Sequence, residues 1–187
     1  MRIVAGSARG RTFDAPQGMD TRPTLDRVRE NVFNILQMKV RGARVLDLFS
    51  GSGAMAFEAV SRGAEHAVLV DSARAAHLTE KANAAKLKME ASCRLMNCDW
   101  AQAVRMLAVA GEKFDLVFLD PPYAMHDMTG VLTALREILA PDAVILLEHE
   151  AKTFPATPDG FHLYDSRKYG IASVSFFRLV AEGEGQA

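Results

Sequence analysis

Hydrophobic positions between residues 43 and 148 fall into two alternating patterns. Short apolar runs are typical of buried parallel strands, and apolar positions three or four residues apart are typical of helices. The runs predict strands at 43–49, 66–71, 92–97, 114–120 and 143–148, and the spaced positions predict helices at 53–61, 73–87, 100–110 and 127–139. Strands that alternate with helices in this way predict an α/β fold with a parallel sheet and right-handed crossovers.

Both ends of the chain depart from this alternation. Residues 2–16 alternate weakly and contain two glycines, which predicts a β-hairpin outside the main core. A helix is predicted from Thr24 to about Met38, because Val28, Val32, Ile35 and Leu36 share one face and Thr24 suits an N-cap. Asp26, in its first turn, is also interpreted as a capping residue.

Near the C-terminus, residues 161–168 and 171–180 predict an antiparallel hairpin that closes the sheet. We therefore expect one domain with three parts, which are a basic N-terminal extension over 1–40, a catalytic core over 41–180 and a frayed tail over 181–187.

Composition fits this picture. The chain has 187 residues and is 49% hydrophobic, which suffices for one sizeable core. No apolar run approaches the roughly 20 residues of a membrane span, and the first residues lack the apolar region of a signal peptide, so we expect a cytoplasmic protein. Cys93 and Cys98 have neither zinc-site nor disulfide spacing, and we expect no metal.

Charge is uneven along the chain. The net charge is −1, but residues 1–44 carry a net +5 and the remainder −6. Clustered Lys and Arg gain affinity for a polyanion by displacing counterions from its phosphates, although an ordinary solvated surface would also carry such charges. The candidate phosphate-binding residues are Arg9, Arg11, Arg22, Arg27 and Arg29.

A glycine-rich loop follows the first strand of the predicted sheet. Gly51, Gly53 and Ala56 match a dinucleotide-binding pattern, and Asp71 lies 20 residues after Gly51, where a carboxylate can accept from a ribose diol. The loop predicts a nucleoside cofactor without deciding between NAD and S-adenosylmethionine. Asp47, just before the glycines, favours S-adenosylmethionine, because a carboxylate there repels a pyrophosphate but suits a cationic amino acid group.

Asp99 and Trp100 follow the third predicted strand. The carboxylate suits an adenine amino group and the indole suits the edge of the adenine ring. Asp99 is equally suited to cap the next helix, and Trp100 is equally suited to the core.

The fourth predicted strand ends in Asp120, Pro121, Pro122 and Tyr123. Each proline fixes its own φ, so the turn is rigid, and ligands of open α/β sheets bind at the carboxyl ends of strands. A planar amine could be held between the Asp120 carboxylate and a main-chain carbonyl, with Tyr123 stacked on the base that carries it. A proline-rich loop without function is the alternative.

Together these motifs resemble class I S-adenosylmethionine-dependent methyltransferases that act on amines. The N-terminal residues 2–11 and 21–30 resemble more narrowly the RsmD family, with Ala5 where we expect glycine in relatives. The resemblance spans residues 2–179. It implies a Rossmann-like, seven-stranded sheet with an antiparallel last strand, and a guanine-N2 methyltransferase acting on small-subunit rRNA that already carries ribosomal proteins. It also places Phe49, Ser50 and Ser72 at the cofactor. We also expect the protein to be a monomer.

Three other functions remain open from the sequence. A DNA adenine-N6 methyltransferase shares the Asp120 turn but usually has a larger target-recognition insertion. An NAD-dependent dehydrogenase explains the glycine loop but not the turn, and a non-catalytic RNA-binding module explains only the arginines. His149 suits either the base pocket or an exposed loop, with the loop favoured, and Tyr169 suits either RNA contact or a hairpin turn.

Overall fold

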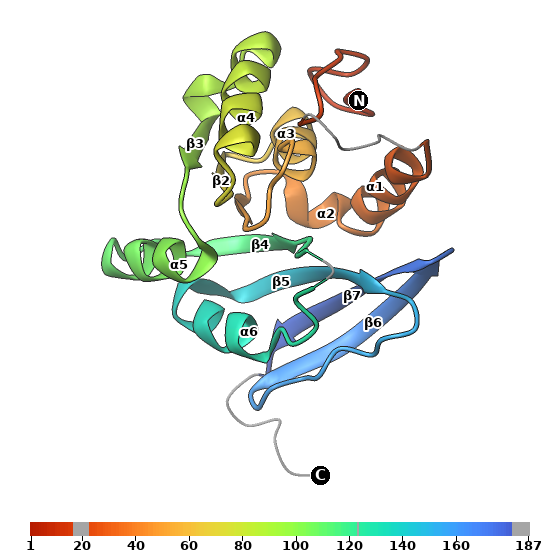
Figure 1. Cartoon of the computed structure of the whole chain (residues 1–187), viewed down its shortest axis with the longest axis vertical. Helices are drawn as coiled ribbons and strands as arrows, with labels where there is room; N and C mark the ends of the chain where they lie inside the picture. Colours follow the sequence, from red (N-terminus) through yellow and green to blue (C-terminus); the bar gives the residue numbers. More distant parts are fainter. Residues whose placement is uncertain (17–22, 123, 181–187) are drawn as a thin grey trace.

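The computed structural model describes residues 1–16, 23–122 and 124–180. Its centre is a seven-stranded sheet in the order β3-β2-β1-β4-β5-β7-β6 (Figure 1). The strands are β1 (Arg44–Asp47), β2 (His66–Val70), β3 (Cys93–Met96), β4 (Phe114–Leu119), β5 (Leu139–Glu150), β6 (Phe161–Tyr169) and β7 (Ala172–Leu179). Neighbours among β1 to β5 pair in parallel, whereas β7 is antiparallel to both β5 and β6. The predicted α/β fold with an antiparallel last strand is confirmed.

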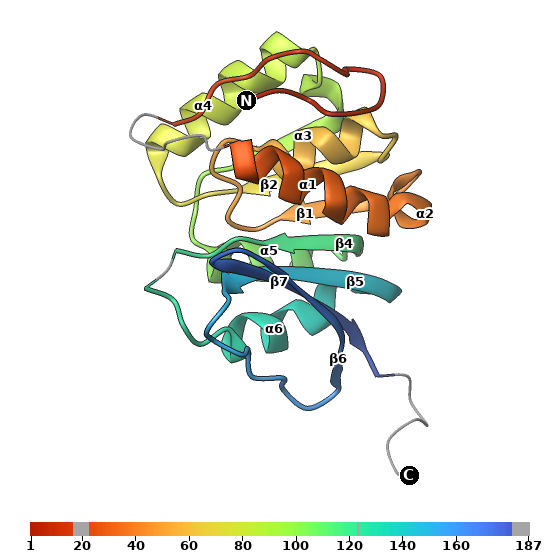
Figure 2. The same ribbon diagram turned by 90° about the vertical axis from the view of Figure 1, so that its right-hand side faces the viewer.

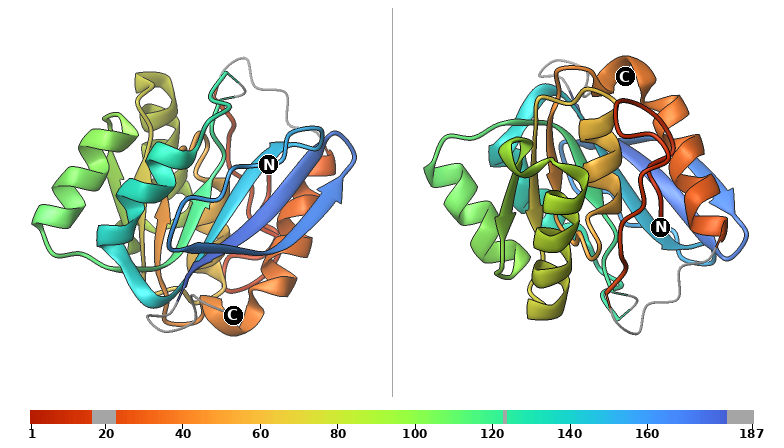
Figure 3. Two further views of the ribbon diagram at one scale, coloured as in Figure 1. Left: turned by 90° about the horizontal axis from the view of Figure 1, so that it is seen from below. Right: turned by 90° about the horizontal axis from the view of Figure 1, so that it is seen from above.

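Helices cover both faces of the sheet (Figures 2 and 3). They are α1 (Pro23–Ile35), α2 (Gln37–Val40), α3 (Ala54–Ser61), α4 (Arg74–Leu87), α5 (Trp100–Val109) and α6 (Thr129–Leu135), with 3-10 turns at Glu90–Ser92 and Arg136–Ile138. Successive strand residues point to opposite faces and enter two apolar clusters. One cluster packs against α1, α3 and α4, and the other against α5 and α6. No helix among the described residues is long and apolar enough to cross a membrane.

Two predicted helices end earlier than expected. The helix predicted to run to Met38 ends at Ile35, and a separate turn of helix, α2, starts at Gln37. The helix predicted over 127–139 shortens to α6 and a 3-10 turn, and β5 already begins at Leu139, which pairs with Phe114 of β4. Apolar spacing alone could not place this boundary, because the side chains around Leu139 suit a buried helix and a buried strand equally.

The two arms of the N-terminal segment pair as an antiparallel hairpin, as the sequence predicts, but the segment does not lie outside the core. Arg2 and Thr12 form a β-bridge, and the Ile3 N–H donates to the Arg11 carbonyl at 2.9 Å. Ile3 and Phe13 are each only 1% exposed and belong to the cluster beneath α3, with the Phe13 ring 6.2 Å from that of Phe57. The segment therefore contributes side chains to the core.

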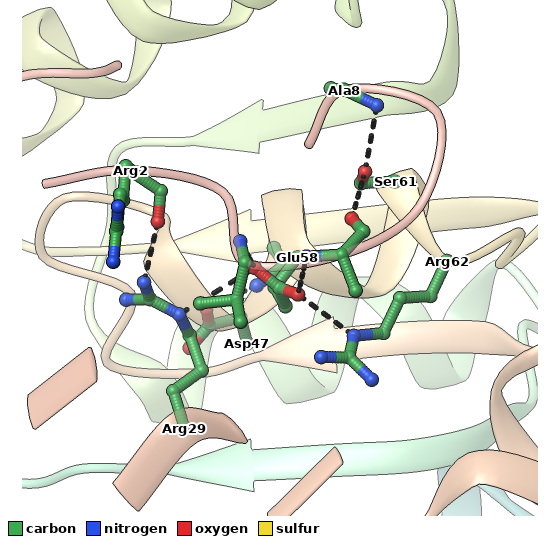
Figure 4. A network of polar contacts seen from close by, with 10 residues as sticks. Arg2, Ala8, Arg29, Asp47, Glu58, Ser61 and Arg62 are labelled. Atoms are coloured by element: carbon green, nitrogen blue, oxygen red, sulfur yellow. Dashed lines mark hydrogen bonds and ion pairs between the residues drawn. The ribbon is translucent and has the colours of Figure 1, made fainter. Parts of the chain in front are cut away.

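Helix α3 holds this segment through buried polar groups (Figure 4). The fully buried Glu58 carboxylate accepts from the backbone N–H groups of Val4, at 2.8 Å, and Ala5, at 3.0 Å. Ser61 Oγ donates to the Ala5 carbonyl and accepts from the Ala8 N–H. A Cβ on Gly6 would lie 1.8 Å from the Ser61 carbonyl oxygen, so only glycine fits at this contact.

Candidate active site

Four of the predicted carboxylates come together along one edge of the sheet. Asp47 ends β1, Asp120 directly follows β4, and Asp71 and Asp99 follow β2 and β3. The strand order reverses between β1 and β4, because β2 and β3 lie on one side of β1 while β4 and β5 lie on the other. Open α/β sheets bind ligands outside the carboxyl ends of the strands at such a reversal.

The glycine loop connects β1 to α3 at this point. The Ser50 N–H donates to the Val70 carbonyl at 3.1 Å, which joins the loop to the end of β2. Gly51 and Gly53 have φ angles of 54° and 79°, which favour glycine. A Cβ on Gly53 would also lie 2.4 Å from the Phe57 ring, whereas one on Gly51 would meet no atom within 4 Å. Packing therefore requires glycine only at position 53.

Asp71 lies against this loop. One carboxylate oxygen accepts from the Gly51 N–H at 3.0 Å, and the other accepts from the Ala73 N–H at 2.8 Å. The Asn97 amide, just beyond β3, donates to the carbonyls of Asp71 and Ser72. These bonds fix the ends of β2 and β3 beside the loop and leave Ser72 exposed. An Asp71 contact with a ribose stays a prediction.

The Asp47 side chain is more deeply buried than the predicted contact with a cationic amino acid group suggests. Its side chain is 2% exposed and accepts from the Ala56 N–H at 3.2 Å. Burial raises its pKa well above 3.8, and the nearby charges of Glu80, Asp120 and Asp71 raise it further. This concentration of negative charge would favour a cationic group.

Glu80 of α4 is a supporting residue that sequence reasoning missed. Its carboxyl is fully buried, and one oxygen lies 2.6 Å from Ser50 Oγ, which in turn donates to the Val70 carbonyl at 3.0 Å. Burial raises the pKa of Glu80 to about 7. A protonated Glu80 can donate to Ser50, whose single proton then satisfies Val70. A carboxyl on the apolar face of α4, between Ala76 and Ala84, was the available signal.

Asp99 and Trp100 take the structural positions that the sequence allowed. Asp99 caps α5, because its carboxylate accepts from the Gln102 N–H at 2.9 Å. Trp100 is half-buried and packs on the cluster beneath α5, together with Phe49 of the loop after β1. Neither position tests a contact with adenine, which stays a prediction.

The turn after β4 lines a pocket at the same edge of the sheet. Asp120, Pro121 and Pro122 line it, and Tyr123 lies outside the described residues. The end of β5 and the chain after it line the same pocket. Asp120 is exposed, but the protein around its carboxyl penalises the charged form and raises its pKa to about 6.

Two further residues, Glu148 and His149, belong to this pocket. Sequence reasoning missed Glu148 and placed His149 elsewhere. Glu148 lines the pocket, and burial together with the charge of Asp120 raises its pKa to about 7. His149 also lines it, so the favoured interpretation as an exposed loop residue is wrong. The histidine lies in β5, with Nδ1 2.9 Å from the Glu150 carbonyl oxygen and Nε2 2.8 Å from Ser175 Oγ.

The candidate RNA-binding arginines do not form one group. Arg9 and Arg27 are exposed, and Arg11 is exposed while one guanidinium nitrogen donates to the Leu87 carbonyl at 3.1 Å. The prediction that Arg29 binds phosphate is corrected, because its side chain is 3% exposed and donates to the Arg2 carbonyl at 2.7 Å (Figure 4). Its guanidinium also lies 3.7 Å from Glu58, so it belongs to the buried network. Arg22 lies outside the described residues.

No group of His, Cys, Asp or Glu within residues 1–16, 23–122 and 124–180 has the arrangement of a metal site. Cys93 and Cys98 are partly buried free thiols, and burial raises the pKa of Cys93 to about 12.

Comparison with known proteins places this arrangement in a family. The model of the family described as "Conserved hypothetical protein 95" matches residues 1–178. The chain belongs to this family. A relative named ribosomal RNA small subunit methyltransferase D from Escherichia coli K12 is 34% identical to this chain over 190 residues, covering 100% of this chain and 94% of that protein. The resemblance to the RsmD family is thereby confirmed.

Solved structures share the fold of this family member. A protein from Thermus thermophilus is 27% identical with a TM-score of 0.82, covering 96% of this chain and 99% of that one. An S-adenosylmethionine-dependent methyltransferase from Agrobacterium tumefaciens is 20% identical with a TM-score of 0.63, covering 84% of this chain and 61% of that one. This second likeness shows the fold alone.

Proposed function

We propose that this protein transfers a methyl group from S-adenosylmethionine to the exocyclic N2 amine of a guanine in bacterial small-subunit rRNA. The observation that carries the proposal is that the Asp120 turn and the glycine loop follow the neighbouring strands β4 and β1, where the strand order reverses, in a chain of this family. The name of the Escherichia coli relative supports small-subunit rRNA as the substrate. We further propose that the protein acts as a monomer in the cytoplasm on RNA that already carries ribosomal proteins.

The residues at the carboxyl edge fit S-adenosylmethionine. The glycine loop allows close approach of a nucleoside, and Asp71 is held beside it with oxygen lone pairs left over for ribose hydroxyls. The sulfonium and ammonium groups of this cofactor are cationic, and the carboxyl groups of Asp47 and Asp71 lie close to one another beside the glycine loop. A pyrophosphate would be repelled there, which disfavours NAD.

When bound, the cofactor supplies an electrophilic methyl group, so the protein needs no nucleophile of its own. The exocyclic amine of guanine is a poor nucleophile because its lone pair is delocalised into the ring. Asp120 and the Pro121 carbonyl would each accept one N–H, which frees the lone pair to point at the methyl group. Positioning of this kind can lower a barrier by up to roughly 7–11 kcal/mol.

Bond changes in this step balance without a metal or redox partner. The amine nitrogen forms the new N–CH3 bond while the S–CH3 bond breaks and leaves its electron pair on sulfur. The nitrogen then releases one proton to the Asp120 carboxylate or to water. Stacking of the flipped base on Tyr123 would offset an unstacking cost of a few kcal/mol.

Calorimetry with the purified protein tests the cofactor, and label transfer tests the acceptor. We expect binding of S-adenosylmethionine and no binding of NAD, followed by transfer of labelled methyl to small ribosomal subunits from cells that lack this protein. Binding of NAD alone would support a dehydrogenase, and label in DNA but not in RNA would support an adenine-N6 methyltransferase. Either result would overturn the proposal.

A further inference from the structure

Two carboxyl groups lie side by side in the pocket beyond the sheet. Leu119 of β4 pairs with Leu147 of β5 in parallel register, so the next residues, Asp120 and Glu148, occupy neighbouring positions on adjacent strands. Adjacent strands are about 4.8 Å apart. Both side chains line the same pocket, and the charge of Asp120 acts on Glu148. The pocket therefore presents a pair of acceptors on one wall.

Asp120 is exposed and Glu148 is partly buried, and the two differ from the buried acids of the protein in their partners. Asp47, Glu58 and Glu80 each accept from or lie against a protein group. Among the hydrogen bonds and ion pairs of the described residues, none involves the carboxyl of Asp120 or of Glu148. Burial raises the pKa of both. Acids held close together without donors indicate a site that receives donors from a ligand.

The histidine of this pocket does not supply those donors. The Glu150 carbonyl can only accept, so the proton of His149 lies on Nδ1, and Nε2 accepts from Ser175, whose hydroxyl lies 3.0 Å from that of Ser166. Both ring nitrogens are thereby used within β5 and its neighbours. His126 and Glu150, the other titratable groups of the pocket wall, are exposed.

We propose that Glu148 selects guanine by accepting the N1–H of the target base, while Asp120 accepts from its N2 amine. The inference rests on the proposed function and assigns base selection to a specific residue. Guanine alone among the four bases carries an amine beside a ring N–H on one edge. Adenine and cytosine carry an amine beside a bare ring nitrogen, whose lone pair would face the Glu148 carboxylate.

A base analogue separates this role from a structural one. 2-Aminopurine keeps the amine at C2 but has a bare N1, so it removes the donor that Glu148 would accept. Small subunits reconstituted with guanine or 2-aminopurine at the methylated position are compared as substrates for wild-type protein, for Glu148→Gln and for a surface control, Glu90→Gln. Glu90 is exposed on the 3-10 turn before β3. Calorimetry with S-adenosylmethionine checks the fold and cofactor binding of each variant.

We expect wild-type protein and Glu90→Gln to prefer guanine by about 100-fold or more in kcat/KM, because the wrong base leaves a buried acceptor unpaired. The side-chain amide introduced by Glu148→Gln can donate to a bare N1, so this variant should lower the rate on guanine about tenfold and reduce the preference at least tenfold. The missing O6 of 2-aminopurine affects all three proteins alike.

An unchanged preference in Glu148→Gln, with cofactor binding retained, would overturn the assignment of Glu148. If the variant fails to fold, equal rates of wild-type protein on the two bases would overturn it just as directly. Absence of transfer to guanine by wild-type protein is a different result, because it contradicts the proposed function itself.

Discussion

At the scale of single residues, the acids of this protein divide by what their carboxyl groups contact. Glu58 and Glu80 are fully buried and hold other parts of the chain, whereas Asp120 and Glu148 face a pocket. An acid that lines a pocket, has a raised pKa and has no protein partner is a candidate for contact with a substrate. Substitution of Glu58 or Glu80 should therefore change stability, whereas substitution of Asp120 or Glu148 should change methyl transfer.

Asp120→Ala should abolish methyl transfer and leave cofactor binding intact. The Asp120 carboxylate is the proposed acceptor for the target amine, and loss of a positioned acid or base typically costs 100-fold or more in rate. Steady-state transfer to small subunits, with calorimetry of S-adenosylmethionine binding, measures both quantities. Asp142→Ala, an exposed residue of β5, is the control. Transfer by Asp120→Ala at the rate of this control would contradict the assignment.

Glu80→Gln should change how stability depends on pH. The pKa of Glu80 in the folded protein is about 7, above the ordinary 4.5, so its contribution is fully present below pH 4.5 and is lost as pH rises toward 7. The loss amounts to at most about 3 kcal/mol. Glutamine does not ionise and can still donate to Ser50.

Urea denaturation across pH 4.5–8 measures this effect. We expect the stability of Glu80→Gln relative to wild-type protein to increase with pH, while the exposed Glu90→Gln shows no such trend. A Glu80→Gln difference that stays constant across this range would show that Glu80 does not titrate there.

At the scale of elements, α3 connects the glycine loop to the N-terminal segment. Gly53 of the loop directly precedes the helix, and Glu58 of the helix also pairs with Arg62 at 2.8 Å and with the buried Arg29 of α1. One carboxylate therefore joins three parts of the chain. Because α3 supports both the loop and the N-terminal segment, their positions are linked.

Glu58→Ala should destabilise the protein by about 3–5 kcal/mol, because it leaves Arg29 and two backbone N–H groups without this acceptor. The free energy of unfolding from urea titration measures the loss, with the exposed Glu65→Ala as control. Equal stability of the two variants would mean that the network contributes nothing beyond an exposed acid.

Sequence reasoning succeeded where function depends on residues close together in the chain. Asp47, the glycines and the Asp120 turn each stand at the end of an apolar run, so their places at the strand ends followed directly. It failed where the role of a residue depends on contacts between distant parts of the chain. The role proposed for Glu148 depends on the register between β4 and β5. The role of Glu80 depends on the contact of α4 with Ser50, and that of Arg29 depends on the fold of the N-terminal segment.

At the scale of the whole molecule, the exposed arginines of the N-terminal segment and the candidate catalytic acids occupy different parts. The exposed Arg9 and Arg11 belong to the N-terminal segment on the α3 and α4 face, and the acids lie along the carboxyl edge of the sheet. The phosphates of an RNA substrate would therefore bind at the N-terminal segment, and its target base would be recognised at the carboxyl edge of the sheet. Phosphate contacts contribute affinity and salt dependence, and base contacts contribute specificity.

Replacing Arg9 and Arg11 together by alanine should weaken RNA binding and lower its salt dependence. Each lost phosphate contact reduces the slope of log K against log salt by about 0.7–0.9. Filter binding of rRNA fragments at several salt concentrations measures the slope. Arg105→Ala with Lys113→Ala removes the same charge near α5, on the other face of the sheet. Equal slopes for the two double variants would remove the N-terminal segment from the interface.

The central claim is that the target atom is N2 of a guanine in small-subunit rRNA. Small subunits from cells lacking this protein are incubated with the purified protein and methyl-labelled S-adenosylmethionine, and the RNA is digested to nucleosides and separated. We predict that the label appears in N2-methylguanosine. Label in any other nucleoside, or no label in the RNA, would contradict the account.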